Sequence, residues 1–187
     1  MGDAEERTRA RRPGDRRVVV GVSGSLGSLT ALHRGADEAR RTDAVLVAVL
    51  AWVPPGGELA HRRAAFPPPE DSLRRAAAER LLGAVDDAFG PDGPGVPWEG
   101  YVVRGTPGPA LVDSADRAGD VLVIGAGRRG GVRHVLFPNV VRYCVAHACC
   151  PVLAVPPSPL QDELAAAHRR LGRWRALDAR DLTDGRT

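Results

Sequence analysis

The chain contains no lysine, so all 26 of its basic side chains are arginines. Together with abundant alanine, glycine and proline, this amino-acid composition is expected of a GC-rich gene. The net charge of +3 therefore does not by itself indicate nucleic-acid binding. The three cysteines, Cys144, Cys149 and Cys150, fall within one short stretch. They cannot build the disulfide framework of a secreted domain, so a reducing cytosol is the expected compartment.

Long apolar runs are also missing. No stretch approaches the roughly eighteen residues that a membrane span requires, and residues 1–17 are charged throughout, without the apolar core of a signal peptide. We therefore expect a cytoplasmic protein without membrane contact. The 187 residues are 43% hydrophobic and 26% charged, which favours one globular core with tails.

Three regions are predicted along the chain. Residues 1–16 are charged and almost free of apolar side chains, which predicts a flexible N-terminal arm. Residues 17–157 have the pattern of a folded domain. Residues 158–187 follow two prolines, and their periodicity predicts an amphipathic C-terminal helix that ends in a fraying polar tail.

The folded region alternates between Val-rich apolar runs and segments of helical periodicity. The runs lack polar alternation, which is typical of strands buried on both faces of a sheet. Strands are predicted at residues 17–22, 44–53, 96–104, 120–125 and 151–155. Helices are predicted after Ser28 as N-cap, over Asp71 to Phe89, after Thr106 as N-cap, and near residues 140–147. Residues 58–69 have no clear period and predict an excursion loop.

Regular alternation of strands and helices predicts a parallel sheet with helices on both faces and right-handed crossovers. Ligands of such sheets bind beyond the carboxyl ends of the strands, at the topological switch point. Ser23 follows the first predicted strand and Gly125 ends the fourth. The sequence therefore indicates both as candidate site residues.

Three segments resemble the universal stress protein family: Val18 to Ser25, Val103 to Pro107, and Val121 to Val155, whose ending from His147 is the most distinctive part. The resemblance spans residues 17–156. It implies a three-layer α/β sandwich with a five-stranded parallel sheet, Rossmann-like and adenine nucleotide alpha hydrolase-like. It also implies a homodimer through the last strand and, in one branch of the family, ATP with magnesium bound at the strand ends.

The nucleotide-binding branch carries the pattern G-x2-G-x9-G-[S/T] after the fourth strand. Small residues there let backbone N–H groups approach the phosphates. Gly125 matches the first glycine, but Arg128, Pro138 and Asn139 stand at the other three positions. Pro138 removes a backbone donor, and binding relatives place an aspartate where this chain has Ser23. The resemblance therefore implies a compromised phosphate cradle.

Two interpretations of this loop remain open. In the first, the glycines after Gly125 form a tight turn and bind no ligand, with Asn139 as the N-cap of the next helix and Val140 following it. Alternatively, Ser23, Gly125, Arg128, Asn139 and Val140 bind nucleotide in an altered mode, with arginine pairing to phosphate. The second interpretation describes a nucleotide sensor or a slow ATPase.

Catalytic and metal constellations are not complete in this sequence. Cys149 and Cys150 have no second cysteine pair for a zinc site and are predicted to pack, and His147 is predicted to be structural. A phospho-receiver would need acidic residues after the first strand and a lysine after the fifth, and both are missing. An oxidoreductase would need Gly-x-Gly-x-x-Gly, but the glycines at 21, 24 and 27 have other spacing.

The sequence therefore predicts a non-enzymatic universal stress protein, a stress-response dimer that acts through contacts with unknown protein partners or through weak ligand sensing. An ATP-binding member with an altered phosphate loop is the alternative. A third, weaker hypothesis is nucleic-acid contact through Arg128, Arg129 and Arg133.

Overall fold

The computed structural model describes residues 16–126 and 140–156. The strands of this part are β1 Arg17–Gly21, β2 Val45–Trp52, β3 Trp98–Arg104, β4 Val121–Gly125 and β5 Val152–Val155. The helices are α1 Leu26–Thr42, α2 Gly57–Arg63, α3 Glu70–Phe89, the 3-10 turn η2 Gly90–Asp92, α4 Pro107–Ser114 and α5 Val140–His147.

The five strands form one parallel sheet in the order β3-β2-β1-β4-β5. In its centre, Val19 of β1 is level with Val47 of β2 on one side and with Leu122 of β4 on the other. The chain reverses its winding direction between β1 and β4, so the topological switch point lies there. The five-stranded parallel sheet predicted from the sequence is confirmed.

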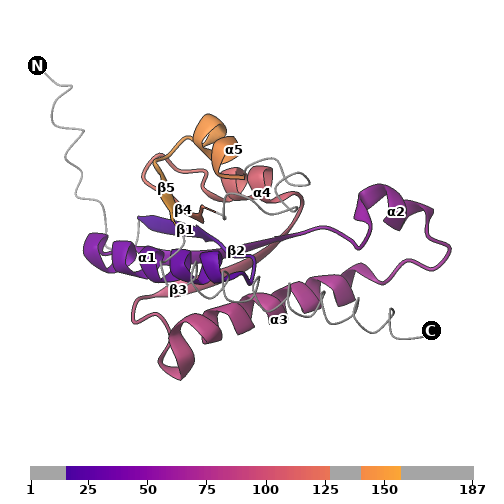
Figure 1. Cartoon of the computed structure of the whole chain (residues 1–187), viewed down its shortest axis with the longest axis horizontal. Coiled ribbons are helices and arrows are strands. Elements are labelled where there is room, and N and C mark those ends of the chain that lie inside the picture. The colour runs from indigo at the N-terminus through magenta and orange to yellow at the C-terminus, as the bar shows by residue number, and fades with distance from the viewer. Residues whose placement is uncertain (1–15, 127–139, 157–187) are drawn as a thin grey trace, which may run out of the picture. The chain divides into compact units, whose positions relative to one another are not determined.

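Helices cover both faces of the sheet (Figure 1). Val18 and Val20 of β1 belong to the core beneath α1 and α3, whereas Val19 belongs to the core beneath α4 and α5. All three are at most 1% exposed. Burial on both faces explains why the strands are continuous apolar runs, and the predicted α/β sandwich is confirmed.

Two sequence predictions are wrong in detail. Helix α1 has Ser25 as its N-cap, not Ser28, because the Ser25 hydroxyl accepts the Ser28 N–H at 3.3 Å and Ser28 is already helical. Residues 58–69 are not wholly a loop, since α2 occupies their first half. Helix α2 buries no residue, so its sequence carries no apolar period that would have predicted it.

Several predictions lie outside the described residues. They concern the N-terminal arm before residue 16, the loop from residue 127 to residue 139 with Arg128, Arg129, Arg133, Pro138 and Asn139, and the C-terminal helix and tail. They stay predictions.

Candidate functional site

The carboxyl ends of β1 and β4 meet at the topological switch point. Val20 of β1 pairs with Val123 of β4, and this register brings the end of each strand to the same edge of the sheet. Ser23 and Gly125 therefore share that edge, as expected. Val140 is the first residue of α5 and half-buried, whereas Arg128 and Asn139 lie outside the described residues.

The Ser23 hydroxyl is engaged within the turn that leads into α1. Its Oγ lies 2.9 Å from Oγ of Ser25, and Ser25 in turn caps α1 by accepting the N–H of Ser28. Ser23 is exposed and carries no charge, whereas an aspartate at this position would offer a carboxylate. The Ser23 side chain thus supports the start of the helix.

Gly125 is in tight backbone contact with α1. A Cβ atom at this position would lie 2.5 Å from the carbonyl oxygen of Gly27 and 2.8 Å from its carbonyl carbon, closer than real Cβ contacts come. The space that a side chain would need is already filled by the first turn of the helix. Packing between β4 and α1 is therefore sufficient to require glycine here, whether or not a phosphate binds.

A cluster of charges lies at the carboxyl ends of β2 and β3. The Arg104 guanidinium donates to both carboxylate oxygens of Glu58, at 3.0 and 2.8 Å, and pairs with Glu70 at 2.6 Å. It also lies 5.8 Å from the ring centroid of Trp52. These contacts lower the pKa of Glu58 and raise that of Arg104. The cluster ties α2 and α3 to the sheet.

The indole of Trp52 is buried beneath this cluster, and its Nε1 has no hydrogen-bond partner among the described residues. Sequence reasoning missed the cluster because its members are far apart in the chain. Arg104 and Glu58 are 46 residues apart, and nothing in either local pattern predicts the other.

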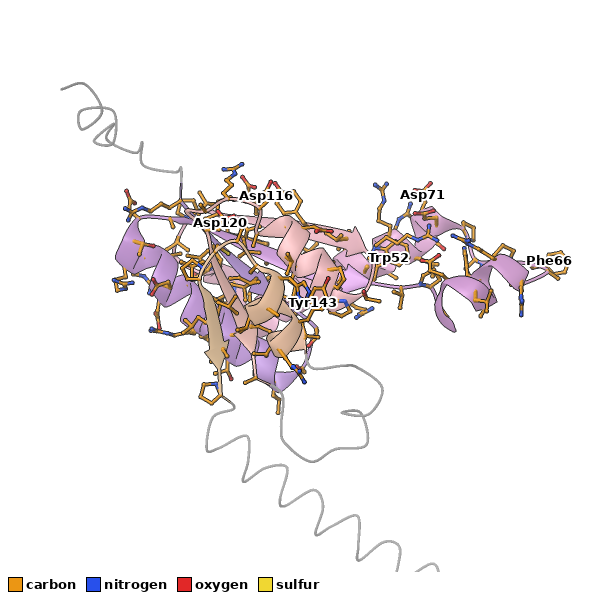
Figure 2. All side chains as sticks on the ribbon, turned by 90° about the horizontal axis from the view of Figure 1, so that it is seen from above. Trp52, Phe66, Asp71, Asp116, Asp120 and Tyr143 are labelled. Carbon is orange, nitrogen blue, oxygen red and sulfur yellow. The ribbon has the colours of Figure 1, made fainter. Side chains whose placement is uncertain are left out.

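A second charged cluster lies at the opposite, amino edge of the sheet. The carboxylate of Asp120 is fully buried and accepts from Nε of Arg17 at 3.1 Å, from Nη2 at 2.5 Å and from the backbone N–H of Arg117 at 3.1 Å. Asp116 pairs with the same guanidinium from an exposed position, which lowers the Asp116 pKa. Figure 2 shows the two aspartates close together, far from Trp52. The arrangement fastens β1 to β4.

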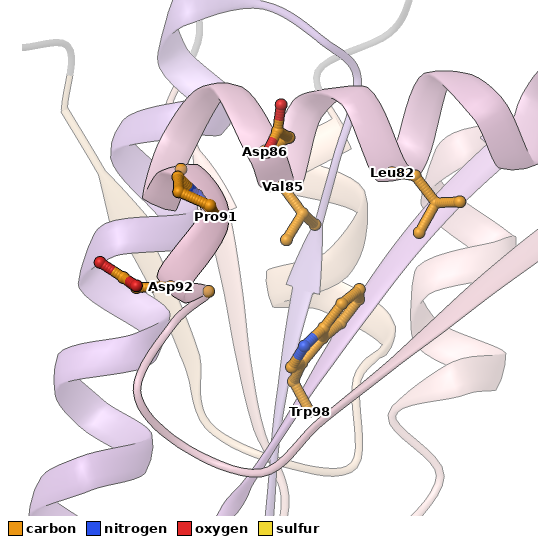
Figure 3. Close-up of a pocket in the computed structure, with 8 residues that line it drawn as sticks. Leu82, Val85, Asp86, Pro91, Asp92 and Trp98 are labelled. Atoms are coloured by element: carbon orange, nitrogen blue, oxygen red, sulfur yellow. The ribbon is translucent and has the colours of Figure 1, made fainter.

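A shallow groove of about 420 Å³ lies at the amino end of β3 (Figure 3). Its floor is Trp98, and its walls come from the end of α3 and from η2. The lining residues are Leu82, Val85, Asp86, Gly90, Pro91, Asp92, Gly93 and Trp98. This edge is the one opposite to Ser23 and Gly125, so the groove is separate from the predicted nucleotide site.

The three cysteines are free thiols with different surroundings. Cys144 and Cys150 are buried, but Cys149 is exposed, so the predicted packing role is wrong for Cys149. A strand would send neighbouring side chains to opposite faces, whereas Cys149 and Cys150 occupy a bend before β5.

Exposed His147 stacks on Tyr143 with ring centroids 4.1 Å apart. Within the described ranges, no three metal-ligating side chains converge.

The comparison with known protein families identifies the chain. Residues 15–156 match a model of the universal stress protein family. The chain belongs to this family. Among its relatives is Universal stress protein Rv1996 of Mycobacterium tuberculosis, 33% identical over 161 residues, which are 82% of this chain and 49% of that protein. The chain spans about half the length of the curated relatives it matches.

Solved universal stress protein structures share the fold. One from Archaeoglobus fulgidus has a TM-score of 0.56 at 23% identity and covers 75% of this chain and 98% of that one. A second A. fulgidus structure, in complex with dAMP, has a TM-score of 0.50 at 21% identity, covering 75% and 97%. In the part of the chain that is described, no helix is long and apolar enough to cross a membrane.

Proposed function

We propose that this universal stress protein domain acts without catalysis, as a cytoplasmic homodimer that binds other proteins and joins its copies through β5. The observation that carries the proposal is the free edge of β5. In the described residues this strand is hydrogen-bonded to β4 alone, so one row of its backbone groups faces away from the sheet.

The register assigns these outward groups to particular residues. The carbonyl of Pro151 accepts the N–H of Leu122, and the carbonyl of Val155 accepts the N–H of Ala126. In a parallel ladder, alternate residues turn their N–H and C=O groups to the same neighbour. The backbone groups of Val152 and Ala154 therefore face the free edge, where a second copy of β5 can pair with them.

The two edges of the sheet differ in charge. The β5 edge is Val-Leu-Ala-Val, without a charged side chain to discourage pairing. The β3 edge is longer and carries Glu99 and Arg104, which engage Tyr101 and Glu58. These features favour β5 as the dimer interface.

We infer a departure from the usual mode of ATP binding at the described residues near the switch point. The Ser23 hydroxyl bonds to Ser25 and supplies no carboxylate, and contact with Gly27 is by itself enough to explain the glycine at Gly125. The A. fulgidus protein solved with dAMP resembles this chain in fold alone, so its ligand is not evidence for nucleotide binding here. We therefore place protein contact ahead of nucleotide sensing, and infer no ATP hydrolysis.

A single proline substitution in β5 tests the dimer. Ala154→Pro removes an outward N–H without touching the ladder to β4, and Ala154→Val is the matched control that keeps the N–H and adds β-branched bulk. In sedimentation velocity at micromolar concentration, the parent chain and Ala154→Val should be dimers and Ala154→Pro a monomer with unchanged circular dichroism. A monomeric parent chain, or a dimeric Ala154→Pro, would refute the β5 interface.

Calorimetry with ATP and magnesium tests the alternative. The protein should give no binding heat corresponding to a dissociation constant below about 10 μM. Tighter binding would make nucleotide sensing through an altered loop the leading function, with Ser23, Gly125, Arg128, Asn139 and Val140 as the residues to vary. The dimer and nucleotide tests are independent, so each can fail alone.

A further inference from the structure

Cys149 and Cys150 aim their sulfur atoms at one acceptor. The Cys149 thiol donates to the carbonyl oxygen of Ala115 at 3.5 Å, and the Cys150 thiol lies 3.9 Å from the same oxygen. Because both residues are in a bend between α5 and β5, their side chains are on the same side of the chain. Two adjacent thiols are thereby held facing one backbone atom.

The two thiols differ in access. Cys149 is exposed, whereas Cys150 is only 8% exposed, and burial raises the pKa of its thiol. The third cysteine, Cys144, is completely buried, with its sulfur 3.8 Å from the carbonyl oxygen of Gly108. A small oxidant in solution therefore meets Cys149 first. Cys150 faces the same Ala115 oxygen, whereas the Cys144 sulfur faces Gly108, two turns earlier on α4.

We propose that Cys149 and Cys150 form a reversible redox site whose substrate is a hydroperoxide. The Cys149 thiolate attacks a peroxide oxygen, the O–O bond breaks, and hydrogen peroxide yields Cys149 sulfenic acid and hydroxide, which takes up the thiol's proton as water. The Cys150 sulfur then attacks the sulfenic sulfur, the S–O bond breaks, and a second water leaves with the Cys150 proton. Two thiols are oxidised to one disulfide, and one peroxide is reduced to two waters.

Covalent geometry makes this disulfide easy to reduce again. Neighbouring Cα atoms are about 3.8 Å apart across a trans peptide, shorter than the roughly 4.4 to 6.8 Å that unstrained disulfides span. Strained and exposed disulfides have the higher reduction potentials and are the labile ones. A dithiol reductant should therefore reopen the ring, as a reversible sensor requires.

Closing the ring alters the start of the edge strand. Both sulfurs leave the Ala115 carbonyl at the end of α4, and the next residue, Pro151, accepts the first β4 to β5 hydrogen bond from Leu122. The pair lies at the amino edge of the sheet, opposite to Ser23 and Gly125. Oxidation of this pair therefore requires neither nucleotide binding nor the β5 dimer.

Mass spectrometry of the full chain tests the site. Reduced protein is treated with hydrogen peroxide, free thiols are blocked with N-ethylmaleimide, and the cysteine peptide is mapped. The parent chain and the control Cys144→Ala should each lose about 2 Da, confined to Cys149 and Cys150 and reversed by dithiothreitol. Cys150→Ser should stop at a Cys149 sulfenic acid that dimedone traps, and Cys149→Ser should react at least about tenfold more slowly.

Three results would overturn the proposal: a disulfide that includes Cys144, a disulfide that links two chains, or a parent chain whose Cys149 passes to the sulfinic acid without a disulfide. Phenylarsine oxide, a probe of paired thiols, tests the geometry without oxidation. It should bind the parent chain and Cys144→Ala in one-to-one ratio and fail to bind a Cys149→Ser variant whose circular dichroism matches the parent. Equal binding to that variant would contradict the pairing.

Discussion

Nη2 of Arg17 lies 2.5 Å from Oδ2 of Asp120, and this ion pair joins the first residue of β1 to the residue just before β4. Asp120 is only 1% exposed, and Arg17 and the backbone N–H of Arg117 supply three hydrogen bonds to its carboxylate. Hydrogen bonding to Asp120 raises the pKa of Arg17. The two strands that flank the switch point are thus fastened at their amino ends.

Replacing Asp120 should lower the free energy of unfolding more than replacing Asp116, because only Asp120 is buried. Asp120→Asn leaves Arg17 without its buried counter-charge and should lower the free energy of unfolding by about 2 to 4 kcal/mol. Asp116→Asn removes the exposed partner of the same guanidinium and should cost much less, because solvent screens that pair. Urea denaturation of both variants measures the difference. Equal losses would mean that burial does not set the strength of this cluster.

The tight contact between Gly125 and Gly27 predicts that a side chain at position 125 lowers the stability of the domain. Gly125→Ala forces β4 and α1 apart and should destabilise the domain by about 1 to 3 kcal/mol, even without nucleotide. The control is Gly83→Ala, because a Cβ there meets nothing within 4 Å on the exposed face of α3. That substitution should stabilise the helix by about 0.5 to 1 kcal/mol. An unaffected Gly125→Ala would leave phosphate binding as the reason for the glycine.

The sequence predicts the sheet well because its strands are buried on both faces, which imposes uninterrupted apolar runs such as Val18 to Val20. It misses α2 because an exposed helix has no apolar period. It also misplaces the α1 cap, since Ser25 and Ser28 are both good caps and only the backbone of Ser25, extended at φ −89° and ψ 156°, decides between them.

The candidate site is less predictable from sequence. Local order in the chain places Ser23 and Gly125 at strand ends, and topology brings those ends together. Contacts such as Arg17 with Asp120 join residues 103 positions apart, and no local pattern records such a pair. The exposure of Cys149 depends on a bend that two adjacent cysteines do not by themselves predict.

Helix α2 should be held to the domain mainly by one side chain. Because none of its residues is buried, the two hydrogen bonds from Arg104 to Glu58 are its principal anchor. Arg104→Met should raise amide hydrogen exchange across residues 57–63 by about tenfold while leaving the sheet protected. Arg74→Met, which removes an exposed arginine paired with Asp71 at 3.5 Å, is the matched control and should change little. Unchanged exchange in Arg104→Met would show that other contacts hold α2.

Cys144 should give the domain a measurable sensitivity to alkaline pH. Burial raises the pKa of its thiol to about 11, whereas the thiol of an unfolded chain titrates near about 8.5. The folded state therefore holds this proton more tightly than the unfolded state. Its contribution to stability is fully present below the unfolded pKa and is lost as pH rises through the folded pKa.

Urea denaturation from pH 8 to 11 measures this loss. Between the two pKa values, Cys144 adds a slope of up to about 1.4 kcal/mol per pH unit to the fall in unfolding free energy. Cys144→Ala should be less stable than the parent chain at pH 8, because it loses buried packing, but its curve should be flatter. The Tyr101 phenol, whose pKa is raised by its hydrogen bond to Glu99, contributes equally to both proteins and cancels in the comparison. Parallel curves would mean that titration of Cys144 does not cause the loss of stability at alkaline pH.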